Sequence, residues 1–219
     1  MRLRRFLITE PMKTSHLLAN PLAGPANKTE LHSSEPTTYT QSVTEQQPFA
    51  LLAKHDQLEI RKYPKYVLVQ TQEQGEFMRA GNYAFNPLLR YISGNNASGT
   101  KIAMTAPVLQ ETQNKDVHTV SFVMPAGFVA TADMLPNSSA LQMVTVDEHY
   151  AAAISFRGSW DAARFERVGQ ELMRRVHELG LTPLGDVYWA RFDPPFKPGF
   201  MKRNEAIVKI AKPTKELAS

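Results

Sequence analysis

Residues 76–93, EFMRAGNYAFNPLLRYIS, predict an amphipathic helix, because their apolar side chains recur at the spacing of one helix face. They fall into two adjacent stripes, one of Phe77, Tyr83 or Ala84, Leu88 and Tyr91 and the other of Phe85, Leu89 and Ile92. Pro87 lies inside this helix, and we expect it to kink the helix or to begin its second half. Residues 94–99, GNNASG, are typical of a helix end.

Strands are predicted on both sides of this helix, since β-branched and aromatic residues cluster there in short runs. Two precede it, at residues 58–63 and 66–71, and two follow it, at residues 101–110 and 118–124. The second half of the chain repeats this order, with strands at 141–146 and 150–156, a helix over 159–179, and strands at 186–192 and 205–210. Tyr66 lies 84 residues before Tyr150, so the halves match in spacing. The pattern predicts an α+β domain of two strand-helix-strand-strand halves with a mostly antiparallel sheet.

The chain divides near residue 48 into a tail and a folded domain. Residues 1–47 hold only two aromatic residues, Phe6 and Tyr39, and four prolines interrupt them. Such a segment buries too little apolar surface to offset the entropy of ordering it. We therefore predict a flexible N-terminal tail over residues 1–47, a folded domain over 48–212 and a C-terminal tail over 213–219.

Composition excludes several classes of function. The chain has no cysteine, which excludes disulfides, thiolate catalysis, zinc fingers, iron–sulfur clusters, thiolate-ligated haem and covalent c-type haem. The net charge of +4 is scattered without a Lys/Arg stripe, so we expect no nucleic-acid partner. No run of about 18 apolar residues is present, so we expect no transmembrane segment. The apolar run Phe6–Ile8 is too short for a signal peptide, which predicts a cytoplasmic location.

The sequence carries no catalytic signature. It contains no Gly-rich phosphate loop, no G-x-S-x-G elbow and no H-E-x-x-H motif, and its six histidines lack the spacing of metal ligands. No acid–base pair stands out, so the sequence favours a binding protein over an enzyme. Met104 and Met124 lie on adjacent predicted strands, where flexible thioethers suit either an irregular core or a flat apolar ligand.

Seven short motifs stand out between residues 56 and 210. They are Leu58-Glu-Ile-Arg-Lys-Tyr-Pro64, Tyr91-Ile-Ser-Gly-Asn95, Lys101-Ile-Ala-Met-Thr-Ala-Pro-Val108, Val120-Ser-Phe-Val-Met-Pro125, Phe156-Arg-Gly-Ser-Trp160, Asp193-Pro-Pro195 and Arg203-Asn-Glu205. In order and spacing they resemble the SOUL/haem-binding protein family. The resemblance implies a distorted antiparallel β-barrel of two four-stranded sheets flanked by two helices. It also implies non-covalent binding of haem or a related tetrapyrrole in an apolar surface cleft, without an established reaction.

The resemblance places the cleft at the first helix and the nearby strands. The helix residues at these positions are Phe85, Leu88, Leu89 and Arg90, and the strands contribute His118 together with Met104 and Met124. The apolar residues would cover the porphyrin face, although packing on the sheet is an equally good interpretation, and Arg90 would pair with a propionate. Some relatives carry a histidine, proposed as the axial iron ligand, where this chain has Lys62. Because a lysine must lose its proton to ligate iron, the ligand stays open, with His118 as a candidate.

The sequence thus favours a monomeric module that binds haem or another tetrapyrrole for buffering, transport or delivery. One alternative is a domain for other hydrophobic or cationic small molecules, or an interaction module, because effector-binding domains of drug-responsive regulators share this duplicated architecture. Such pockets usually hold a buried carboxylate, and neither helix here has Asp or Glu on its apolar stripe. A second alternative is an enzyme acting on tetrapyrroles, which nothing in the sequence selects.

Overall fold

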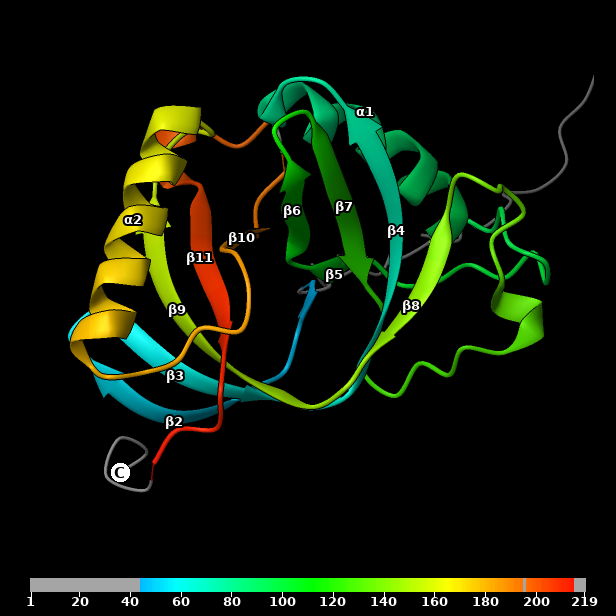
Figure 1. The fold of residues 1–219 in the computed structure, drawn as a ribbon. Helices are drawn as coiled ribbons and strands as arrows, with labels where there is room; N and C mark the ends of the chain where they lie inside the picture. The colour runs from blue at the N-terminus through cyan, green and yellow to red at the C-terminus, as the bar shows by residue number, and fades with distance from the viewer. Residues whose placement is uncertain (1–43, 195, 215–219) are drawn as a thin grey trace, which may run out of the picture. The chain divides into compact units, whose positions relative to one another are not determined.

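The computed structural model of the chain describes residues 44–194 and 196–214, which form two α-helices and a curled β-sheet (Figure 1). The strands are β1 (Glu45–Gln46), β2 (Ala50–His55), β3 (Leu58–Tyr63), β4 (Tyr66–Gln74), β5 (Thr105–Ala106), β6 (Val108–Asn114), β7 (Val117–Val123), β8 (Gln142–Val146), β9 (His149–Arg157), β10 (Tyr188–Arg191) and β11 (Arg203–Ile210). The helices are α1 (Phe77–Ile92) and α2 (Ala162–Glu178), with 3₁₀ turns η1 (Ala132–Met134) and η2 (Gly199–Met201). The helices and strands expected from the sequence are present, except that the single strand expected at residues 101–110 is two strands, β5 and β6, which belong to different sheets. Strands β1 and β2 are additional.

Within the described residues, nine strands form one antiparallel sheet in the order β2-β3-β9-β11-β10-β6-β7-β4-β8. The expectation of two separate four-stranded sheets is therefore wrong. Strand β10 is the reason, because it pairs with β11 on one side and with β6 on the other, which joins the two halves. Ala190 of β10 lies opposite both Glu205 and Leu109. The joined sheet curls into a half-barrel, and β1 pairs in parallel with β5 beside it.

The predicted tails lie mostly outside the described residues. Of the N-terminal segment over 1–47, the structure describes residues 44–47, of which Glu45 and Gln46 form β1. Of the C-terminal segment over 213–219, it describes residues 213 and 214. The extent and flexibility of both tails stay predictions.

Each helix begins at an acidic side chain that caps its free backbone N–H groups. The carboxylate of Glu76 accepts hydrogen bonds from the backbone nitrogens of Met78 at 3.0 Å and Arg79 at 3.2 Å. Asp161 does the same for α2, accepting from the nitrogen of Arg164 at 2.9 Å. These caps satisfy donors that have no partner within the helix, so they define where α1 and α2 start.

Each helix lies against the curled sheet (Figure 1). A hydrophobic core fills the space between each helix and the sheet. Helix α1 continues through Pro87 as one helix, and it packs on β4 and β7 with Ala84, Leu88 and Tyr91 fully buried. Helix α2 packs on β9 and β11 through Phe165, Leu172 and Val176. The predicted amphipathic packing is confirmed for both helices. In the part of the chain that the structure describes, neither helix is long and apolar enough to span a membrane.

Candidate functional site

A cleft of about 430 Å³ opens where α1, β5, β6 and the segment after β10 meet. Its lining includes Gly81, Phe85, Met104, Val108, Trp160 and Arg191. The first four come from the first half of the duplicated domain, and the last two come from the second half. The cleft therefore exists only because the two halves are joined.

One part of the cleft is apolar. Phe85 of α1 packs edge-on against Phe122 of β7, with ring centroids 5.4 Å apart, which holds the Phe85 ring in place. Met104 and Val108 line the cleft from the segment before β5 and from the start of β6. All three lining side chains are only partly buried. A flat apolar ligand lying against them would remove this surface from water, which is favourable.

Another part of the cleft carries Arg191, the last residue of β10. Arg191 is only 4% exposed, and this burial lowers the pKa of its guanidinium to about 10, so the group is still charged at neutral pH. Its Cζ lies 4.7 Å from the centroid of the Trp160 ring, which is a cation–π contact. Among the described residues, Arg191 has no ion-pair partner, and its Nε has no hydrogen-bond acceptor.

The charged groups near Arg191 do not neutralise it. Asp193 accepts hydrogen bonds from Lys197 Nζ at 2.6 Å and from the backbone nitrogen of Arg203 at 2.5 Å. Burial alone would raise the pKa of Asp193, but these bonds lower it, so the carboxylate is ionised and already paired. Lys202 is a second cation, and burial together with the charge of Arg191 lowers its pKa. Asp193 also lines the cleft, but its carboxylate is paired with Lys197 and not with Arg191.

Trp160 is held in a defined position beside the guanidinium. Its Nε1 donates a hydrogen bond to Asn204 Oδ1 at 3.1 Å, and Asn204 Nδ2 donates in turn to the carbonyl oxygen of Gly158 at 3.1 Å. Lys202 Nζ also lies 4.0 Å from the centroid of the indole ring. The indole thus contacts two cations, of which Arg191 is the one that lines the cleft.

The structure brings two of the sequence-predicted site residues to this cleft, Phe85 and Met104. Leu88 is fully buried in the core under α1, while Leu89 and Arg90 are exposed on α1 outside the cleft lining. Met124 packs in the same core as Leu88 and borders a different hollow, of about 700 Å³, beside β4. The predicted residues therefore do not form one surface.

The two candidate iron-ligand positions also lie outside the cleft lining. His118 has both ring nitrogens engaged, with Nε2 2.9 Å from the carbonyl oxygen of Gly75 and Nδ1 3.1 Å from Thr112 Oγ1. Lys62 Nζ forms an ion pair with Glu148 at 2.9 Å, and this bond raises the pKa of Lys62. In residues 44–194 and 196–214, no group of three or more His, Asp or Glu side chains is arranged to hold a metal ion.

Sequence reasoning did not single out Arg191 or Gly81, and it named Trp160 as the last residue of a family motif rather than as a residue of the cleft. A signal for Arg191 was present in β10, whose four residues are YWAR. Residues two apart on a strand share a face, so Arg191 lies on the same face as Trp189, which belongs to the core under α2. An arginine two residues after a core tryptophan indicates a buried charge that needs an explanation.

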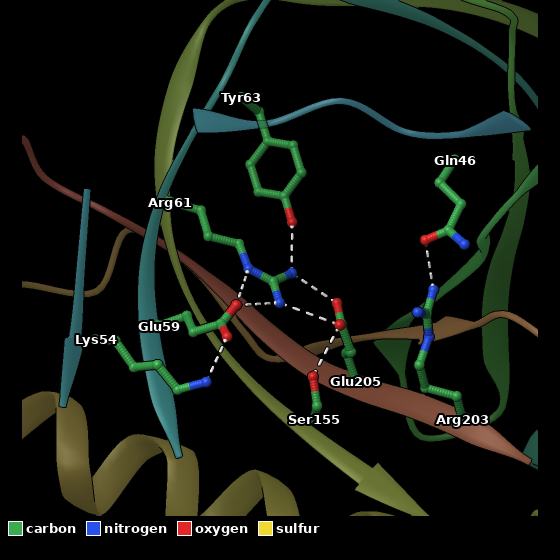
Figure 2. Close-up of polar contacts among 8 residues, drawn as sticks. All are labelled: Gln46, Lys54, Glu59, Arg61, Tyr63, Ser155, Arg203 and Glu205. Carbon is green, nitrogen blue, oxygen red and sulfur yellow. Dashed lines mark hydrogen bonds and ion pairs between the residues drawn. The ribbon is translucent and has the colours of Figure 1, made fainter. Parts of the chain in front are cut away.

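A second buried arginine, Arg61 of β3, lies in a network of polar contacts (Figure 2). It donates to both carboxylate oxygens of Glu205, at 2.6 and 3.1 Å, and to Glu59 Oε2 at 2.7 Å from Nη2. Tyr63 Oη accepts from it at 3.1 Å, and Ser155 Oγ donates to Glu205 at 2.9 Å. Burial alone would lower the pKa of Arg61, but the hydrogen bond to Glu205 raises it. The fold itself neutralises this cation.

Comparison with known proteins gives a family and a fold. The family model described as SOUL heme-binding protein matches residues 44–209. Among solved structures, the C-terminal domain of EcmrR has a TM-score of 0.55 and 14% identity, covering 72% of this chain and 98% of that one. A hydrolase from Listeria innocua has a TM-score of 0.51 and 12% identity, covering 73% and 94%. Comparison with curated proteins finds no match. At these identities the structural likeness extends to the fold alone.

Proposed function

The chain belongs to the SOUL heme-binding protein family, and from this premise we propose that it binds haem or a related tetrapyrrole non-covalently in the cleft beside α1. The observation that carries the proposal is the apolar surface of this cleft, where Phe85 and Met104 line a volume of about 430 Å³. This volume falls within the range of about 300–1,000 Å³ found for small-molecule sites. The function that follows is reversible uptake, for buffering, transport or delivery.

In this proposal the partly buried apolar side chains contact the ring, and the fully buried ones support them. Phe85, Met104 and Val108 line the cleft and cover one face of the tetrapyrrole. Leu88 and Met124 belong to the core cluster against which those side chains pack. Residues predicted from the sequence thus divide into a contact layer and a supporting layer, and truncation of the contact layer should affect affinity more than stability.

The remaining predicted residues are given other roles. Leu89 and Arg90 are exposed on α1, so they would meet only a part of the ligand that extends beyond the cleft. His118 would have to give up two hydrogen bonds to ligate iron. We therefore assign the retention of haem to packing. Of the side chains that line the cleft, Met104 would offer haem iron a thioether sulfur as a ligand.

The proposal is tested by titrating haem into the purified chain and following the Soret absorption band. We expect saturable binding that weakens about tenfold in Phe85→Ala, because a buried aromatic contact is lost. Tyr83→Ala is the matched control, since Tyr83 is an exposed aromatic residue of the same helix, and it should leave affinity unchanged. Binding no tighter than to an unrelated protein, or equal affinities for the two variants, would contradict the proposal.

A further inference from the structure

Arg191 is a buried cation for which the described residues supply no anion. It is 4% exposed, and it lines the cleft together with Trp160 and Gly81. Its Nε has no acceptor in the part of the chain that the structure describes, and the carboxylate of Asp193 is already engaged by Lys197. Burial of an ionised group without a partner raises the free energy of a protein, so such a group needs a function or a ligand to account for it.

Gly81 creates the space in which the guanidinium lies. A Cβ atom at this position would come within 2.5 Å of Arg191 Nη2 and 2.7 Å of Nη1, closer than van der Waals contact allows. Any other residue would therefore displace the guanidinium. The Trp160 ring, 4.7 Å from Arg191 Cζ, confines the group from another direction. The guanidinium is thus confined between the Trp160 ring and the helix backbone at Gly81, and neither of these carries a negative charge.

The charges around Arg191 attract an anion into the cleft. Lys202 lies on the same indole ring and adds a positive charge, and the carboxylate of Asp193, which also lines the cleft, is paired with Lys197. A guanidinium presents several N–H donors in a planar fork that matches the two oxygens of a carboxylate. In a site screened from water, this pairing is stronger than it is at an exposed surface. For the ligand class of the proposed function, the complementary group is a carboxylate that projects from the aromatic ring.

We infer that the cleft is a selective site for planar aromatic ligands that carry a carboxylate, and that Arg191 forms the ion pair with this carboxylate. The inference rests on the proposed function, because it takes the same cleft as the ligand site. It adds that the ligand carries a negative charge and that Arg191 recognises this charge. It also predicts that cationic aromatic molecules are rejected.

The test uses two fluorescent probes that share a ring and differ in charge, 1-pyrenebutyrate and 1-pyrenebutylamine. Each is titrated into the full chain, and binding is followed by fluorescence anisotropy. We expect the carboxylate probe to bind at least about tenfold more tightly than the ammonium probe, given the usual strength of a hydrogen bond to a charged group. Arg191→Met should abolish the preference, and Arg191→Lys should keep part of it. Arg167→Met, which removes an exposed arginine of α2, should leave it unchanged.

Equal affinities for the two probes, no binding of the carboxylate probe, or a preference that survives in Arg191→Met would overturn the inference. Thermal unfolding of each variant verifies that the domain is folded, and Arg191→Lys keeps the test available if Arg191→Met does not fold. A parallel haem titration separates the two proposals. Haem uptake without the probe preference would leave the proposed function standing alone, whereas the preference without haem uptake would support a carboxylate site for another ligand.

Discussion

Arg61 and Arg191 are almost equally buried, at 2% and 4% exposure. They differ in whether the described residues supply a carboxylate to pair with the buried charge. Arg61 donates to the carboxylates of Glu59 and Glu205, so the fold surrounds it with acceptors (Figure 2). Arg191 contacts the ring of Trp160 and, among the described residues, no carboxylate. Accordingly, hydrogen bonding raises the pKa of Arg61, whereas burial lowers the pKa of Arg191 to about 10.

The presence or absence of a carboxylate partner distinguishes the roles of the two residues. Arg61 stabilises the fold, and Arg191 is the residue that we infer to bind the ligand. Breaking a buried pair by removing one partner is strongly destabilising, because the other charge is left unpaired. In the free protein, Arg191 already lacks a carboxylate partner among the described residues. Its charge raises the free energy of the unliganded fold and is neutralised when an anion binds. The two sites should therefore respond differently to substitution.

The largest effect is expected at the Arg61 network. Glu205→Ala removes two hydrogen bonds to Arg61 and one from Ser155. We expect the free energy of unfolding to fall by about 3–5 kcal/mol, measured by urea denaturation. Glu166→Ala, at an exposed position of α2, is the control and should change it by less than about 0.5 kcal/mol. A loss below about 1 kcal/mol for Glu205→Ala would show that the network does not act as described.

The next effect concerns the space beside Arg191. In Gly81→Ala the new methyl group would displace the Arg191 guanidinium and the Gln110 side chain. We expect the affinity for 1-pyrenebutyrate to fall about tenfold, equivalent to about 1.4 kcal/mol. Asn86→Ala, at an exposed position of the same helix, should leave the affinity unchanged. If both variants bind the probe as the wild type does, the position of Arg191 does not determine binding.

Arg191→Met should have a smaller effect on stability, and one of opposite sign to Glu205→Ala. Because it replaces an unpaired buried charge with an apolar side chain, the free energy of unfolding should stay level or rise by about 1–2 kcal/mol. The same urea experiment measures it in the absence of ligand. A loss as large as that of Glu205→Ala would mean that Arg191, like Arg61, is a structural cation, and the contrast between the two sites would disappear.

The smallest effect is a pH dependence beside the Arg61 network. His149 stacks on Tyr63 with centroids 5.3 Å apart, and burial lowers its pKa below the ordinary value of 6.5, with the charge of Lys209 lowering it further. The unfolded chain therefore takes up this proton first as the pH falls, so stability should decrease below about pH 6.5. We expect the loss from this group to be smaller than the effects of the substitutions above. His149→Phe should reduce the slope between pH 7 and 5, and an unchanged slope would exclude His149 as its source.

Much of the fold was predictable because its signals are local. The helical spacing around Leu88 and Leu172 and the short β-rich runs located α1, α2 and the strands that flank them. The number of sheets was not predictable, because it depends on β10, a strand of four residues that pairs with the next strand, β11, and also with β6, which lies far away in sequence. No local pattern indicates that Ala190 pairs with both Leu109 and Glu205.

The candidate site was predictable only on its apolar side. Phe85 and Met104 carried a recognisable pattern, and both line the cleft. Arg90 was the expected anion partner because it lies on the same predicted helix, but it is exposed outside the cleft lining. The cation that does line the cleft comes from the other half of the domain, so only the tertiary structure brings Arg191 to α1.

The most direct test is a crystal structure of the chain with protoporphyrin, a tetrapyrrole that carries two propionates. The ring should lie against Phe85 and Met104, with one propionate carboxylate within hydrogen-bonding distance, about 2.7–2.9 Å, of the Arg191 guanidinium. A ring bound along the exposed side of α1 at Leu89 and Arg90, with Arg191 still unpaired, would contradict both the proposed site and the role assigned to Arg191.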